Sequence, residues 1–261
     1  NHLKHEIQRL TQTLALEKQN SVTLIAQAQQ QAKAAPKPLP NHHSNNTAFA
    51  EDSILALSIQ FDDHKQLLNS VNQSVSMPYF KLCQLFLDKS IALCSQHYQI
   101  DAAQIQLLEP FNAEGVSLST GAEQPHALEC LMMVGAVFQL LADVLYKRYR
   151  EDKRFALQTR AAVANRVDAM QLDAVEAAKR LAQHLEAKQA ALHLNHAQLK
   201  HIQDCYELVA MPNPSNIMTR QAFMINGMNE QCATLAQNLR TEILMGKKAK
   251  TIEESADIST P

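Results

Sequence analysis

Apolar residues recur along two long segments of the chain at alternating steps of three and four positions. The longer series lies between residues 148 and 211, a stretch without glycine or proline, and the shorter one follows at residues 224–243. This spacing is typical of the apolar seam of a coiled-coil helix. The longer series comprises Val163, Val167, Met170, Ala174, Ala177, Leu181, Leu185, Lys188, Leu192, Asn195, Leu199, Ile202, Tyr206 and Val209.

Two prolines and two asparagines separate the two series, in the sequence MPNPSN at residues 211–216. Proline ends helices, and a connection of this length is enough to join two antiparallel helices. The two series therefore predict a long antiparallel coiled-coil hairpin over residues 161–246. A polar tail is predicted to follow it at residues 247–261.

A separate series with the same spacing begins the chain, at Leu3, Ile7, Leu10 and Leu14. It predicts an amphipathic helix over residues 1–33, which cannot bury its apolar face by itself and needs a partner. Residues 34–52 contain three prolines within five positions, followed by His and Asn. That composition predicts a linker between this helix and the rest of the chain.

Residues 53–160 contain two strongly apolar segments, at 79–94 and 128–146. Each is apolar around most of its circumference, which predicts helices at the centre of a bundle. The second segment includes Glu129, Gln139 and Asp143, so a buried helix is predicted there rather than a membrane span. We therefore predict an all-α protein: a helical bundle core, the long antiparallel coiled-coil hairpin and a separate N-terminal amphipathic helix.

Composition and charge narrow the classes of partner. The chain has 46% hydrophobic residues, five glycines and a formal net charge of −2. A charge so close to zero provides no general attraction for nucleic acid, so no nucleic-acid partner is predicted. Five cysteines form no CxxC pair and lie in apolar patterns, which predicts reduced, buried thiols and a cytoplasmic location. They are Cys83, Cys94, Cys130, Cys205 and Cys232.

Sequence signatures of catalysis and of cofactor binding are not found in the chain. It contains no glycine-rich phosphate loop, GxSxG elbow, HExxH pair or zinc-type spacing of Cys and His. His193, His196 and His201 lie close together, but surface histidines on a helix are the simpler interpretation. His97 is one helical turn from Cys94, whereas catalytic pairs usually come from separate elements. We therefore predict a protein that is not an enzyme and that has no cofactor and no metal.

A basic segment after the second apolar helix is a candidate binding surface. Lys147, Arg150 and Arg154 fall on one helical face, where they can engage phosphate groups or an acidic partner. Glu151 and Asp152 lie in the same segment, so a solvated charged face is the alternative. The unpaired seams are the other predicted partner sites, at Leu3, Ile7, Leu10, Leu14, Val163, Val167 and Met170.

The chain ends in acidic residues followed by small and hydroxyl residues, EESADISTP at residues 253–261. This tail is similar to the translocation signals of secreted effectors. The glycine-poor, heptad-bearing chain resembles coiled-coil proteins of bacterial type IV secretion systems, both effectors and helical components. The resemblance and the seams together predict a non-enzymatic scaffold or adaptor that binds protein partners, or further copies of itself, through coiled-coil helices. The alternative is a secreted effector that acts by binding, on cytoskeleton or membrane traffic in the cytosol of a host cell.

Overall fold

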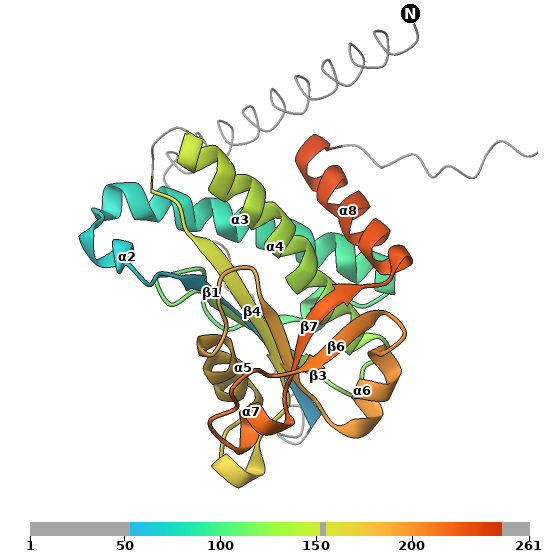
Figure 1. The fold of residues 1–261 in the computed structure, drawn as a ribbon. Helices are drawn as coiled ribbons and strands as arrows, with labels where there is room; N and C mark the ends of the chain where they lie inside the picture. The colour runs from blue at the N-terminus through green and yellow to red at the C-terminus, as the bar shows by residue number, and fades with distance from the viewer. Residues whose placement is uncertain (1–52, 152–154, 247–261) are drawn as a thin grey trace, which may run out of the picture.

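A seven-stranded β-sheet lies at the centre of the protein (Figure 1). The computed structural model describes residues 53–151 and 155–246. The strands are β1 (Ile54–Asp62), β2 (Gln106–Leu107), β3 (Val116–Gly121), β4 (Gln158–Ala164), β5 (Ala190–His193), β6 (Tyr206–Ala210) and β7 (Phe223–Met228). In the sheet they are ordered β2-β3-β1-β4-β5-β7-β6. All neighbours pair antiparallel except β4 and β5, which are parallel.

Helices cover both faces of this sheet. On one face lie α3 (Gln73–Tyr98), α4 (Ala127–Glu151) and α8 (Glu230–Met245), and on the other lie α5 (Ala174–Gln183) and α7 (Ile217–Gln221) (Figure 1). α6 (His196–Ile202) connects β5 to β6. Three short elements complete the described residues: α2 (Leu67–Ser70) and two single turns of 3₁₀-helix, η2 (Ala102–Gln104) and η3 (Asp168–Met170).

The central strands β1 and β4 are buried along most of their length, so apolar residues lie on both of their faces. In β1, Leu55, Leu57 and Ile59 belong to the core beneath α3 and α4, whereas Ala56 belongs to the core against α5. The neighbouring β4 has the same alternation, with Ala161 and Val163 on the α4 side. The sheet therefore separates two apolar cores.

Polar side chains cap the start of several helices, whereas Gly246, with a φ angle of 63°, ends α8. Asp173 caps α5 by accepting from the Glu176 N–H at 2.8 Å, and Asn195 caps α6 by accepting from the Gln198 N–H at 2.9 Å. Such caps satisfy the free N–H groups at a helix start. Gln171 and Lys188, with φ angles of 53° and 67°, turn the chain in the left-handed region.

The prediction of an all-α protein is wrong, and so is the predicted coiled-coil hairpin over residues 161–246. That segment contains four strands and four helices, of which α5 is only 10 residues long. Short strands that are apolar on both faces have no period of two, so apolar spacing alone does not separate them from a buried helix. The chain does reverse after Met211, but the segments that pair there are β6 and β7, with α7 between them. The predicted seam of Leu3, Ile7, Leu10 and Leu14 lies outside the described residues.

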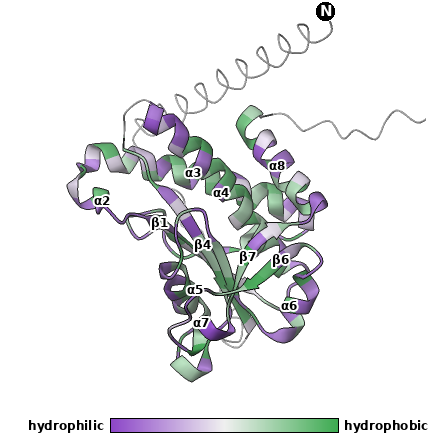
Figure 2. Cartoon of the chain, viewed as in Figure 1, coloured by the Kyte–Doolittle hydropathy of each residue, from purple (hydrophilic) through white to green (hydrophobic). Residues whose placement is uncertain are grey.

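The two apolar segments predicted as central helices are confirmed as α3 and α4. α4 is long and apolar enough to cross a membrane by length and composition, but 67% of its most apolar window is buried inside the fold. Figure 2 shows that α4 is hydrophobic over most of its length and hydrophilic at its C-terminal end.

Candidate functional site: a cavity between α4 and the sheet

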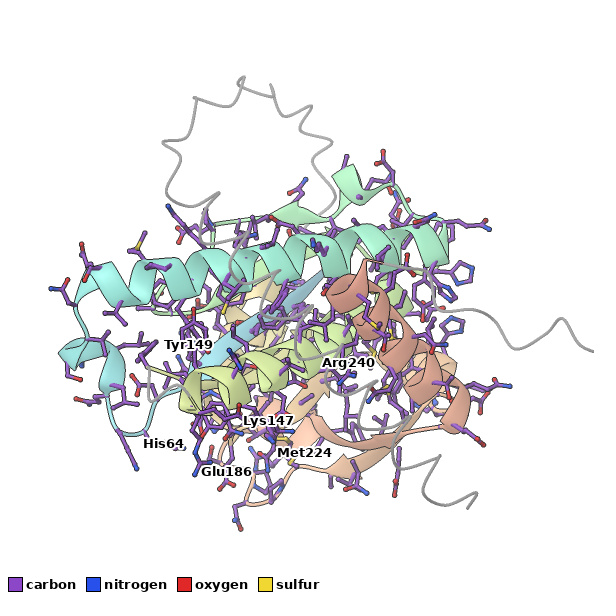
Figure 3. The ribbon with its side chains drawn as sticks, turned by 90° about the horizontal axis from the view of Figure 1, so that it is seen from above. His64, Lys147, Tyr149, Glu186, Met224 and Arg240 are labelled. Carbon is purple, nitrogen blue, oxygen red and sulfur yellow. A yellow bond between two sulfur atoms is a disulfide. The ribbon has the colours of Figure 1, made fainter. Side chains whose placement is uncertain are left out.

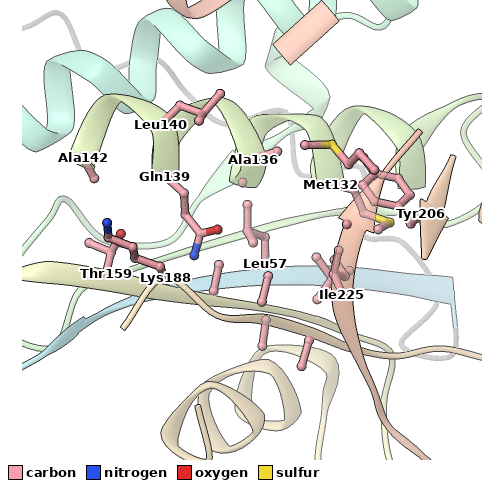
Figure 4. Close-up of a pocket in the computed structure, with 18 of the residues that line it drawn as sticks. Leu57, Met132, Ala136, Gln139, Leu140, Ala142, Thr159, Lys188, Tyr206 and Ile225 are labelled. Atoms are coloured by element: carbon pink, nitrogen blue, oxygen red, sulfur yellow. The ribbon is translucent and has the colours of Figure 1, made fainter. Parts of the chain in front are cut away.

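A cavity of about 310 Å³ lies where α4 crosses the sheet. Both small and large residues line it. The sheet contributes Leu57 of β1, Ala161 and Val163 of β4, Ala190 of β5 and Ile225 of β7, and the helix contributes Met132, Gly135, Ala136 and Gln139. In Figure 4, Gln139 reaches from α4 towards the sheet, between Thr159 and Lys188 at one end and Tyr206 and Ile225 at the other.

Small residues on α4 and on the sheet line much of the cavity. Leu131 and Phe138 of α4 are fully buried, and Gly135 and Ala136 between them line the cavity. Ala161 and Ala190, which line it from the sheet, are equally small. Protein interiors are normally packed without voids of this size, so this cavity is a specific feature of the fold.

Tyr206 closes one end of the cavity. Its side chain belongs to a residue that is only 5% exposed, and among the described residues its hydroxyl group has no hydrogen-bond partner. Burial raises the pKa of Tyr206, and Tyr98, Cys94 and Glu129 raise it further, so the phenol stays protonated. A buried hydroxyl without a partner is rare and unfavourable.

Charged residues surround the other end of the cavity, which opens to solvent. Asp143 of α4 pairs with Lys147 through Oδ2 and with Lys188 through Oδ1, each at 2.8 Å. Burial acts to raise the pKa of Asp143, but the hydrogen bonds from Lys147 and Lys188 outweigh it and lower the pKa. The carboxylate is therefore ionised at neutral pH, between two ammonium groups.

Lys188 is held at this opening by its backbone. Its φ angle is 67°, which is uncommon for a residue with a side chain, and its N–H donates to the Thr159 carbonyl at 2.8 Å. The turn before β5 thus directs the ammonium group over the end of the cavity. Sequence reasoning placed Lys188 and Tyr206 in a seam and gave them no role, because no local motif marks residues that meet only through folding.

A surface groove adjoins this opening and contains two of the residues predicted as a basic patch. Lys147 and Arg150 line it, together with Tyr146, Glu151, Gln158 and the Asp143–Lys188 pair. Figure 3 shows Lys147 at the end of α4, on the same side of the molecule as His64 and Glu186. Arg154, the third predicted residue, lies outside the described residues.

The predicted seam residues of the central segment are parts of the fold's interior or its turns. Val163 lies in β4 and lines the cavity, and it is 4% exposed, as is Val167 just after the strand. Met170 ends η3 and is half-buried. The structure therefore does not bring Val163, Val167 and Met170 together as one exposed apolar stripe.

Carboxylates elsewhere are engaged by protein groups. Asp62 Oδ1 lies 2.8 Å from His64 Nε2 and 3.8 Å from Arg160 Nη1. Burial lowers the pKa of Arg160, an effect that Asp62 opposes, and Arg160 also donates to the Leu185 carbonyl at 2.7 Å. Over residues 53–151 and 155–246, no three His, Cys, Asp or Glu side chains are arranged to hold a metal ion.

The three predicted metal candidates are not one cluster. His201 of α6 pairs with Glu129 of α4 at 2.7 Å, whereas His193 of β5 lies 3.4 Å from Gln221. His196 is the first residue of α6 and is exposed. Their arrangement connects α6 and β5 to neighbouring elements of the fold.

The cysteines depart in part from the prediction of reduced thiols. Cys83, Cys94 and Cys130 are free and buried, and burial raises the pKa of each thiol, to about 11 for Cys130. A thiol with a raised pKa is a poor nucleophile, so the Cys94–His97 spacing carries no catalytic pair. Cys205, before β6, and Cys232, in α8, form a disulfide instead.

No family model and no curated protein matches the chain. Among solved structures, the guanylyl cyclase Cya2 is similar at 12% identity, over 68% of this chain and 93% of that one, with a TM-score of 0.48. The adenylyl cyclase CyaB from P. aeruginosa is similar at 11% identity, over 68% and 95%, with a TM-score of 0.48. The guanylate cyclase domain of RhGC from Catenaria anguillulae, in complex with GTP, is similar at 10% identity, over 69% and 98%, also at 0.48.

The fold corrects the predicted resemblance and function. The described residues form a seven-stranded sheet with helices on both faces, so the resemblance to coiled-coil secretion proteins is wrong. The non-enzymatic scaffold is corrected with it, because the coiled-coil hairpin through which it was predicted to bind consists of strands and short helices. At this level of similarity the solved structures assign no activity or substrate to this chain.

Proposed function

We propose that the chain binds a small, largely apolar organic molecule in the cavity between α4 and the sheet. The observation that carries the proposal is the cavity itself, about 310 Å³ lined mainly by apolar side chains with a few polar groups at its ends. Binding sites for small molecules commonly have this composition. A dry apolar cavity of about 150 Å³ is enough to bind benzene, so this one has room for a larger molecule.

The lining also favours a ligand over solvent. An apolar molecule in the cavity would contact Leu57 and Ala161 and would remove its own apolar surface, and theirs, from water.

The proposal is tested by enlarging the side chain of a sheet residue that lines the cavity. In the full-length chain, Ala161→Leu extends a side chain into the space below Gly135. Ala197→Leu makes the same substitution at an exposed position of α6, outside the cavity, and is the matched control. A set of small aromatic and aliphatic compounds is screened by ligand-observed NMR against the unmodified chain and both variants.

We expect compounds that bind the unmodified chain to keep their affinity for Ala197→Leu and to lose at least about tenfold with Ala161→Leu, the equivalent of about 1.4 kcal/mol. Unchanged binding to Ala161→Leu, or no binding to any of the three proteins, would overturn the proposal.

GTP and ATP enter the same screen with an assay for cyclic nucleotides, because the similar structures are named as cyclases. Formation of a cyclic nucleotide would replace binding alone with an enzymatic activity.

A further inference from the structure

The opening of the cavity carries an excess of positive charge. Lys147, Arg150 and Lys188 lie around the groove there, against the carboxylates of Asp143 and Glu151. Asp143 lies between two of these cations, with Lys147 Nζ 2.8 Å from Oδ2 and Lys188 Nζ 2.8 Å from Oδ1. Its charge is therefore offset by two ammonium groups, and a cationic ligand would meet three positive side chains at the opening.

The lysines retain hydrogen-bonding capacity. An ammonium group has three N–H donors, and the contact of Lys188 with Asp143 uses one of them. The Lys188 side chain is 56% exposed and also lines the cavity, so the same group faces both solvent and the interior. Loss of its contact with Asp143 would leave that carboxylate paired with Lys147.

We infer that the ligand is an organic anion, whose apolar body lies beneath α4 and whose carboxylate or similar group binds Lys188 at the opening. This inference rests on the proposed binding function and adds the chemical class of the ligand. The apolar lining excludes a ligand that is charged at both ends, because a second charge beside Leu57 and Ala161 would be buried without a partner.

The chemical class is tested with pairs of compounds that differ only in charge. Phenylacetate and phenylacetamide, hexanoate and hexanamide, and naphthylacetate and naphthylacetamide are titrated into the full-length chain and followed by NMR of the protein. The variant Lys188→Met removes the charge and keeps an unbranched side chain. Lys200→Met, at an exposed position of α6 that does not line the cavity, is the control.

We expect each carboxylate that fits to bind at least about fivefold more tightly than its amide, a difference that salt reduces. With Lys188→Met the preference should fall below about twofold while the amide keeps its affinity, and with Lys200→Met nothing should change. Equal or tighter binding of the amides to the unmodified chain would overturn the inference and leave the proposed function standing. If neither member of any pair binds and Ala161→Leu has no effect on any compound, the proposed function itself fails.

Discussion

Buried alanines lie on both faces of the sheet, but the helices that they meet differ. Ala161 and Ala162 are neighbours in β4, and each is almost completely buried. Ala162 meets α5, whose inward side carries Ala174, Ala177, Ala178 and Ala182, and belongs to a core built mostly of alanine. Ala161 belongs to the other core, on the α4 side, and both alanines border the cavity.

The side chains of the two helices differ. On α5 the inward residues Ala174, Ala177, Ala178 and Ala182 are all small, and none of them lines the cavity. On α4 the small residues Gly135 and Ala136 line it beside the larger Met132 and Gln139. The cavity thus lies on the side of the sheet where the helix presents residues of different sizes.

The largest expected difference in stability is between two variants that enlarge a side chain on opposite faces of β4. Ala162→Leu forces a larger side chain against α5 and should destabilise the fold by about 3 kcal/mol, because overpacked cores shift backbone and rotamers. Ala161→Leu enters the cavity and should change the free energy of unfolding by less than about 1 kcal/mol. Urea denaturation of both variants measures the contrast. Equal destabilisation would mean that the α4 face has no usable space.

Two buried tyrosines provide the next contrast. The Tyr79 hydroxyl donates to the Leu157 carbonyl at 2.9 Å, whereas the Tyr206 hydroxyl beside the cavity has no partner among the described residues. Tyr79→Phe should therefore lose about 1–2 kcal/mol of stability, and Tyr206→Phe should be neutral or gain up to about 1 kcal/mol. Thermal unfolding without added ligand separates the two. A loss as large for Tyr206→Phe as for Tyr79→Phe would show that its hydroxyl has a partner.

The sequence predicts the long central helices of this fold and fails on its strands. Residues 79–94 and 128–146 are long enough for helical apolarity to be unmistakable, and they are parts of α3 and α4. β4, in contrast, has the sequence QTRAAVA, in which alanine favours a helix when the chain is considered alone. Pairing with β1 and β5 decides its structure, and those partners are about 100 residues and 30 residues away.

The cavity could not be predicted from the sequence, for a related reason. Its lining residues come from α4, β1, β4, β5 and β7, which lie far apart in the sequence and meet only in the folded chain. Lys147 and Arg150 were predicted as a binding surface from their spacing on one helical face, and they do share a groove. Lys188, which joins them there, comes from a turn that spacing along a helix does not describe.

Substitution of Gly135, which lines the cavity, should change the free energy of unfolding less than the two preceding pairs of variants, and should stabilise the fold. A Cβ added to Gly135 of α4 would lie 3.3 Å from Leu57 Cδ1, the end of a side chain with free space beside it. Alanine is favoured over glycine inside a helix by about 1 kcal/mol, so Gly135→Ala should raise the free energy of unfolding by about 0.5–1 kcal/mol. Ala178→Gly, in α5 against the other face, should lower it by a similar amount. A loss for Gly135→Ala in urea denaturation would mean that Leu57 cannot move into the space.

The smallest effect is expected at the contact between α4 and α6, which joins Glu129 to His201. Glu129 Oε1 accepts from His201 at 2.7 Å and from His126 at 3.2 Å. Burial acts to raise the pKa of Glu129, but its own backbone N–H, His201 and His126 outweigh this effect and lower the pKa from its usual 4.5. The ionised form therefore stabilises the fold fully above the usual value, and the contribution is lost as the pH falls through the lowered one.

Glu129→Gln should accordingly flatten the loss of stability below about pH 5, by less than about 1 kcal/mol because the group is partly exposed. Glu176→Gln is the control on the other face, since Glu176 pairs only within α5, with Arg180 at 3.0 Å, and both side chains are about half exposed. Urea midpoints between pH 7 and pH 3 should converge for Glu129→Gln and the unmodified chain at the acid end and differ near neutrality. Parallel curves would mean that the Glu129–His201 contact adds nothing to folding, and that α4 is held over the cavity by its apolar packing alone.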